Sequence, residues 1–152
     1  MTLTQKETGL LKDLRDQEKL CWEKYSKYSC EACSEELKSL FDSISQVEHN
    51  HYDTVTSMLS GNVPSVPEGT LKNENNGWCH KISYKDTRSA DIDKFLASDM
   101  LAMEKHVSAL YDTSVFEFSD PNARRLLNHI QAEEQQHGKQ LYSFLAANGM
   151  YQ

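Results

Sequence analysis

The feature that most constrains this chain is the pattern Glu-x-x-His, which occurs twice. One copy is Glu48-His49-Asn50-His51 and the other is Glu134-Gln135-Gln136-His137. On an α-helix, residues three positions apart lie on one face about a turn from each other, so each copy directs a carboxylate and an imidazole toward the same point. One copy alone is weak evidence, because glutamate and histidine also meet at this spacing by chance. Two copies on helices that face each other predict a site for two metal ions.

A glutamate upstream of each copy strengthens this prediction. Glu18 lies 30 residues before Glu48, and Glu104 lies the same distance before Glu134. The chain therefore contains two triplets of glutamate, glutamate and histidine that are related by a shift of 86 residues: Glu18/Glu48/His51 and Glu104/Glu134/His137. The same shift relates residues at core-type positions: Tyr25 to Tyr111, Leu40 to Leu126 and Ile44 to Ile130. Polar and apolar positions repeat together, which indicates a duplicated helical hairpin.

Apolar residues that recur every three or four positions predict four helices, at about residues 4–32, 34–60, 89–116 and 121–148. Each expected start carries residues that cap helices. In chain order these are Thr4 with Glu7 in a capping box, Ser34, Ser89 or Asp91, and Asp120 followed by Pro121. The length of 152 residues suits a single domain, residues 1–152.

Residues 61–88 break the helical pattern. Prolines, glycines and a run of asparagines leave no helical period in this segment, and Trp78, Ile82 and Tyr84 are the side chains that could hold it on the protein. A connection this long fits an all-α fold, a four-helix bundle whose second and third helices run parallel, because the link must then cross the length of the bundle.

The glutamates of both triplets interrupt otherwise apolar helical faces. Four carboxylates inside a bundle are costly on their own, because unpaired buried charge is heavily penalised. Two divalent cations would balance the four charges, and two neutral imidazoles would complete the set of ligands. Any one inward glutamate can equally be a tilted surface residue or a protonated carboxyl group. The interpretation as a metal site therefore depends on the two triplets taken together.

At these residues the sequence resembles the ferritin-like superfamily, whose di-iron and di-manganese members take a glutamate from each of two helices and Glu-x-x-His from each of the other two. The resemblance implies iron as the metal, with manganese or zinc as alternatives. A site that keeps the geometry and holds no metal is the other interpretation. The implied roles are terminal ligands for Glu18 and Glu104, bridging ligands for Glu48 and Glu134, and one metal each for His51 and His137.

Over most of its length the chain also looks like the coat F family of bacterial spore coat proteins. This resemblance is carried by Leu10-Leu11-Lys12-Asp13-Leu14 leading to Glu18-Lys19, and by Glu133-Glu134-Gln135-Gln136-His137-Gly138-Lys139-Gln140-Leu141-Tyr142 leading to Asn148-Gly149-Met150-Tyr151. It implies a ferritin-like four-helix domain that is made in the cytoplasm of the mother cell of a sporulating bacterium and assembled into the spore coat. Its partners would be further copies of the chain or other spore coat proteins.

Residues close to the two triplets carry their own expectations. Glu133 should point away from the site, although a shift of one residue in helix phase would exchange it with Glu134. Tyr25 and Tyr111, about two turns beyond the upstream glutamates, could form hydrogen bonds to oxygens in the shell around the ligands but are more simply core residues. The remaining histidines are expected at the surface or partly buried: His49, His80, His106 and His129.

The cysteines predict no disulfide framework, because four are too few and too unevenly spread. Cys30-x-x-Cys33 lacks the second pair that a zinc site would need and no βαβ pattern surrounds it, so it is more simply two thiols near a helix end. Together with Cys79 these thiols could cross-link the protein in an oxidised coat.

Charge and hydropathy limit the partners. The net charge is −7 and no basic cluster occurs, which argues against binding to nucleic acid. The first residues lack the apolar stretch of a secretory signal, and no run of about 18 apolar residues is present. We therefore expect no nucleic-acid partner, no membrane span and synthesis in the cytoplasm.

Two functions from different classes are compatible with the sequence. The first is a structural coat component on a ferritin-like scaffold, and the second is a di-iron oxidase or peroxidase of rubrerythrin-like type that acts on oxygen or peroxide. A rubrerythrin-like peroxidase would be expected to carry a glutamate where this chain has Val107, and ferritin-type storage would usually show a fifth helix, whereas this chain ends 15 residues after His137. The sequence does not decide whether the protein is an enzyme.

Overall fold

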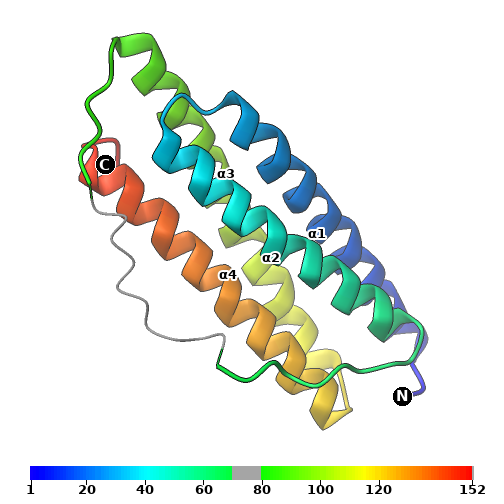
Figure 1. The fold of residues 1–152 in the computed structure, drawn as a ribbon. Coiled ribbons are helices and arrows are strands. Elements are labelled where there is room, and N and C mark those ends of the chain that lie inside the picture. The colour runs from blue at the N-terminus through cyan, green and yellow to red at the C-terminus, as the bar shows by residue number, and fades with distance from the viewer. Residues whose placement is uncertain (70–79, 152) are drawn as a thin grey trace.

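The computed structural model describes residues 1–69 and 80–151, and in these residues it contains four helices and no strand. The helices are long and lie alongside one another as a bundle (Figure 1). Their limits lie within two residues of those predicted from periodicity. Trp78, one of the side chains expected to hold the connection, falls outside the described residues. The helices are α1 (Gln5–Glu31), α2 (Glu35–Leu59), α3 (Thr87–Glu117) and α4 (Pro121–Ala147).

Three of the predicted helix starts are confirmed. The Thr4 hydroxyl accepts a hydrogen bond from the Glu7 N–H at 3.1 Å, while the Glu7 carboxylate accepts one from the Thr4 N–H at 2.8 Å. Ser34 accepts from Leu37 at 3.3 Å. Asp120 caps α4, which has proline in its first turn. These caps satisfy N–H groups that have no partner inside the helix.

The predicted start of α3 was wrong. Neither Ser89 nor Asp91 caps this helix; Asp86 does, by accepting a hydrogen bond from the Ser89 N–H at 2.7 Å. Several polar residues near this point could cap a helix. The residue that does so is the last one with an extended backbone before the helix begins. Asp86 has φ −154° and ψ 164°, so α3 begins at Thr87.

Hydrogen bonds between distant residues fix the directions of the helices. At one end of the bundle, the amino group of Met1 donates to the carbonyl of Gly61 at 2.8 Å, and the Ser119 N–H donates to Glu7 at 3.3 Å. This end therefore holds the start of α1, the end of α2 and the end of α3.

The opposite end is held by Asp93 of α3. Its carboxylate, which is fully buried, accepts hydrogen bonds from the N–H groups of Cys33 at 2.6 Å and Ser34 at 3.0 Å, and from the Tyr84 hydroxyl at 2.8 Å. The loop between α1 and α2 thus lies beside the start of α3. It follows that α2 and α3 run in the same direction, as Figure 1 also shows.

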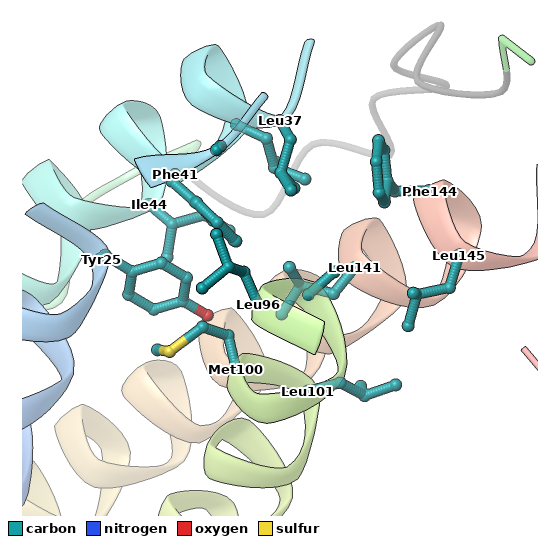
Figure 2. Packing of buried hydrophobic residues seen from close by; sticks show 13 residues of the cluster. Tyr25, Leu37, Phe41, Ile44, Leu96, Met100, Leu101, Leu141, Phe144 and Leu145 are labelled. Atoms are coloured by element: carbon teal, nitrogen blue, oxygen red, sulfur yellow. The ribbon is translucent and has the colours of Figure 1, made fainter. Parts of the chain in front are cut away.

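Two apolar clusters fill the bundle, one toward each end. Figure 2 shows the cluster near the loop between α1 and α2, where Tyr25, Phe41, Leu96 and Leu141 bring side chains from all four helices together. The other cluster includes Leu14, Val55, Tyr111 and Leu127. The triplets predicted from sequence lie near the middles of the four helices, between these two clusters.

The capping box gives the first testable prediction. The backbone N–H of Thr4 is the main cause that lowers the pKa of Glu7 below 4.5, so the carboxylate stabilises the fold above that pH and this stabilisation is lost as the pH falls through the lowered pKa. We expect Glu7→Gln to reduce the free energy of unfolding by about 1 kcal/mol at neutral pH. Urea unfolding from pH 7 to about pH 3 should show the difference from wild type shrinking with acid. A difference that stays constant over this range would contradict the assignment.

Candidate metal centre

The structure brings all six predicted residues together at the middle of the bundle. Each helix supplies a glutamate, and α2 and α4 each supply a histidine one turn further on, as the helical spacing requires. All six side chains are buried, with at most 5 % of their surface exposed. They are Glu18, Glu48, His51, Glu104, Glu134 and His137.

The six residues form two overlapping groups that share Glu48 and Glu134. Within each group, one possible ligand atom from every residue lies within 4.8 Å of the others. We call these groups half-sites. The first half-site is Glu18, Glu48, His51 and Glu134, and the second half-site is Glu48, Glu104, Glu134 and His137.

Both histidines direct the same ring nitrogen into the cluster. Nδ1 of His51 lies 3.1 Å from Glu48 and 2.9 Å from Glu134. Nδ1 of His137 lies 3.2 Å from Glu48 and 3.5 Å from Glu104. Each half-site therefore offers one imidazole nitrogen and carboxylate oxygens from three helices, a set of donors that suits iron, manganese or zinc.

Several buried oxygens in the cluster have acceptor capacity that the protein does not fill. Nδ1 of His51 carries at most one proton, which cannot serve both Glu48 at 3.1 Å and Glu134 at 2.9 Å. Buried polar atoms are nearly always partnered, so oxygens without a donor mark a place for a cation. Among the residues that the structure describes, none donates a hydrogen bond to Glu18 Oε2, Glu104 Oε2 or either carboxylate oxygen of Glu134.

The pKa shifts in the cluster also indicate more carboxylate groups than the nearby hydrogen-bond donors can satisfy. Burial and the nearby Glu48 raise the pKa of Glu18 to about 8, and burial likewise raises the pKa of Glu104 and of Glu134. Burial opposes ionisation of Glu48 too, but the hydrogen bonds from the two histidines outweigh it and hold its pKa well below the usual range. Burial also disfavours a charged His137, yet Glu104 and Glu48 raise its pKa to about 10. The residues present thus fit a cation site, since bound cations would stabilise all four carboxylates in their charged form.

The two tyrosines related by the repeat are more than core residues. Both rings are fully buried in the apolar clusters, as expected, but both hydroxyls donate hydrogen bonds to glutamates of the site. Tyr25 donates to Glu104 and Tyr111 donates to Glu18, so each tyrosine reaches across to the other hairpin. The repeat pairs these tyrosines in the sequence, whereas their partners depend on how the hairpins face each other.

Glu133 does not belong to the cluster, in line with the expectation, but it contacts one of the clustered histidines from outside. Its carboxylate lies 2.7 Å from Nε2 of His51, on the side of the ring opposite the cluster, and its other oxygen lies 3.4 Å from Nε2 of His129. The imidazole ring has a nitrogen on each side, so two successive residues of α4 can contact it. Glu134 lies on the side that faces the cluster, and Glu133 lies on the opposite side. His129, expected at the surface or partly buried, is buried with 8 % of its surface exposed.

The other histidines and cysteines lie apart from the cluster. His49 stacks on Trp22 with ring centroids 4.0 Å apart, and His80 and His106 are exposed. Cys21 is buried, while Cys30 and Cys33 are exposed free thiols near the end of α1. Cys79 falls outside the described residues.

Two hollows reach the cluster from the surface. The larger, of about 700 Å³, is a groove between α3 and α4 that is bordered by Glu104 and Glu134. The smaller, of about 280 Å³, lies between α2 and α4 and is bordered by His137. Both hollows thus lie against residues of the second half-site, whose carboxylate groups are themselves buried.

Comparison with known proteins gives one match to a family model. Residues 92–152 match the family model of the Coat F domain, a range that contains most of α3 and all of α4. Three of the six clustered residues lie in this range, namely Glu104, Glu134 and His137. No curated protein and no solved structure matches the chain.

In the part of the chain that the structure describes, no helix is both long and apolar enough to span a membrane.

Proposed function

We propose that this chain is a spore coat protein with a ferritin-like fold and a dinuclear metal centre in the middle of its helical bundle. The Coat F domain match over residues 92–152 supports the place of action. The metal centre is supported above all by one observation, the two half-sites that share Glu48 and Glu134 and contain buried oxygens without a hydrogen-bond donor. Two divalent cations would balance the four carboxylates.

Each of the six residues has a role in this proposal. Glu48 and Glu134 belong to both half-sites and would bridge the metals, whereas Glu18 and Glu104 would each bind one. His51 and His137 would bind through Nδ1, the nitrogen that faces the carboxylates. Tyr25 and Tyr111 would hold the two terminal carboxylates by their hydroxyl groups. Iron is the metal we expect, with manganese or zinc as alternatives.

Assembly into a coat requires contacts with further copies of the chain or with other coat proteins. Phe95 and Phe116 of α3 expose 68 % and 77 % of their surface. Aromatic side chains are enriched at the centres of protein interfaces, so we propose these two as contact points for a partner. We propose that the protein is made in the mother cell and deposited in the spore coat, where the metal centre adds to the stability of the bundle.

A second candidate function is an oxidase or peroxidase that acts on oxygen or peroxide. The groove between α3 and α4 favours it, because a small molecule bound in the groove would lie beside Glu104 and Glu134. Bound iron or manganese would supply the redox chemistry. Val107, one turn after Glu104, is fully buried, so this helix offers no additional carboxylate at that position. Turnover of peroxide with a reductant would distinguish this function from a structural role.

Elemental analysis after anaerobic reconstitution with ferrous iron tests the metal centre. We expect about two metal ions per chain in the wild type and loss of both in Glu48→Gln/Glu134→Gln, because these two residues belong to both half-sites. The control is Glu23→Gln/Glu36→Gln, which makes the same chemical change at two exposed positions and should keep two ions. Folded wild-type protein without metal would contradict the proposal and leave a purely structural bundle.

A further inference from the structure

The two half-sites differ in what lies behind their histidines. Glu133 places one carboxylate oxygen 2.7 Å from the outer nitrogen, Nε2, of His51. Its side chain is only 15 % exposed, and its second oxygen lies 3.4 Å from Nε2 of His129. His51 is therefore held between the carboxylates of the cluster and a further carboxylate outside it.

The internal repeat shows what the second half-site has at the same place. A shift of 86 residues carries Glu133 onto Val47 and His129 onto Ser43. Both Val47 and Ser43 border the smaller hollow, together with His137. Glu133 borders this hollow too, but its two oxygens are directed to His51 and His129. The position that would supply His137 with an outer carboxylate is thus occupied by an apolar side chain.

This difference bears on metal affinity. A carboxylate that accepts the Nε2 proton of a histidine fixes the ring and its tautomer, leaves the Nδ1 lone pair facing the metal, and makes that nitrogen more basic. Loss of such a partner typically weakens metal binding by about 10- to 100-fold. The two hollows also border Glu104 and His137, which belong to the second half-site alone, and neither is bordered by Glu18 or His51.

We infer that the two half-sites bind metal unequally, and that the first half-site fills first because Glu133 positions His51. The inference rests on the proposed dinuclear centre. Glu133 is a positioning residue in it and touches no metal. The metal of the second half-site is the weaker and faster to exchange, since no carboxylate of the described residues lies behind its histidine and both hollows are bordered by its residues.

Anaerobic titration with cobalt(II), which stays divalent and absorbs visible light when bound, tests the inference. Wild-type protein should bind two ions in steps whose dissociation constants differ by about tenfold or more. Glu133→Ala should weaken the first step by about tenfold, shift its absorption bands and bring the two steps close together. Glu133→Gln, which keeps an acceptor and loses the charge, should lie between these two. The exposed Glu23→Gln control should match wild type.

A variant that is expected to bind metal more tightly provides an independent test, because a loss of folding could not produce that result. Val47→Glu introduces the missing carboxylate at a half-exposed position and should tighten the second step while leaving the first unchanged. Glu18→Gln should weaken the first step only, and Glu104→Gln the second only, which assigns the steps to the half-sites.

The outcomes separate this inference from the proposed function. Two steps of equal affinity in the wild type, or an unchanged titration of Glu133→Ala, would overturn the unequal half-sites and leave the dinuclear centre standing. Folded wild-type protein that takes up no cobalt would overturn both.

Discussion

Binding of ferrous iron at the tighter half-site is expected to raise the free energy of unfolding by about 4 kcal/mol, once free metal exceeds the dissociation constant of that half-site by about a thousandfold. The six ligands come from four helices and meet only in the folded chain, so the metal binds the folded state almost exclusively. For a domain of this length the gain corresponds to a rise of roughly 10 °C in the melting temperature. Anaerobic thermal unfolding with iron and with a chelator measures it.

The variants described above sharpen this measurement. Glu48→Gln/Glu134→Gln should melt at the same temperature with iron and with chelator, because the two residues common to both half-sites are gone. The Glu23→Gln/Glu36→Gln control should keep the full shift. If iron leaves the melting temperature of wild-type protein unchanged, the carboxylate cluster does not serve as a metal centre.

The second large effect is expected at Asp93, far from the metal centre. Asp93→Ala should reduce the free energy of unfolding by about 4 kcal/mol, because it removes the fully buried acceptor of the Cys33 and Ser34 N–H groups and of the Tyr84 hydroxyl. Asp93→Asn keeps part of the acceptor capacity and should cost about half as much. Urea unfolding at neutral pH measures both.

Asp91 provides the matched control for this result. It lies two residues earlier in the same helix and is exposed, so Asp91→Ala should change stability by less than about 0.5 kcal/mol. A cost below about 1 kcal/mol for Asp93→Ala would show that water replaces the lost acceptor and that this carboxylate does not fasten the loop to α3.

The parts of the structure that could be predicted from sequence are those with local signals. The helices follow from apolar spacing, and the caps at Thr4, Ser34 and Asp120 from residues within one turn of each helix start. The six clustered residues were identified because each histidine is one turn from its glutamate and the whole arrangement is repeated. One such triplet would have been indistinguishable from a chance pattern.

What was missed depends on how distant segments meet. Asp93 is separated by about 60 residues from the N–H groups whose hydrogen bonds it accepts. No pattern within α3 indicates that its carboxylate is buried and bonded to the loop between α1 and α2. The contact between Glu133 and His51 was missed because a helix face was treated as one direction, whereas the His51 ring is wide enough to touch two neighbouring faces of α4. The partners of the tyrosines were missed because they depend on how the two hairpins face each other. Tyr25 reaches α3 and not its own hairpin.

The sharing of Glu48 and Glu134 between half-sites has a consequence for the origin of the chain. Each half-site takes residues from both hairpins, so a single hairpin with three of the ligands is incomplete by itself. Two identical hairpins related by a twofold axis would complete the same centre, which makes a homodimer the simplest ancestor of this fold. Fusion into one polypeptide would release the halves from being identical. The carboxylate at position 133 and the valine at position 47 are a divergence that two identical chains could not have.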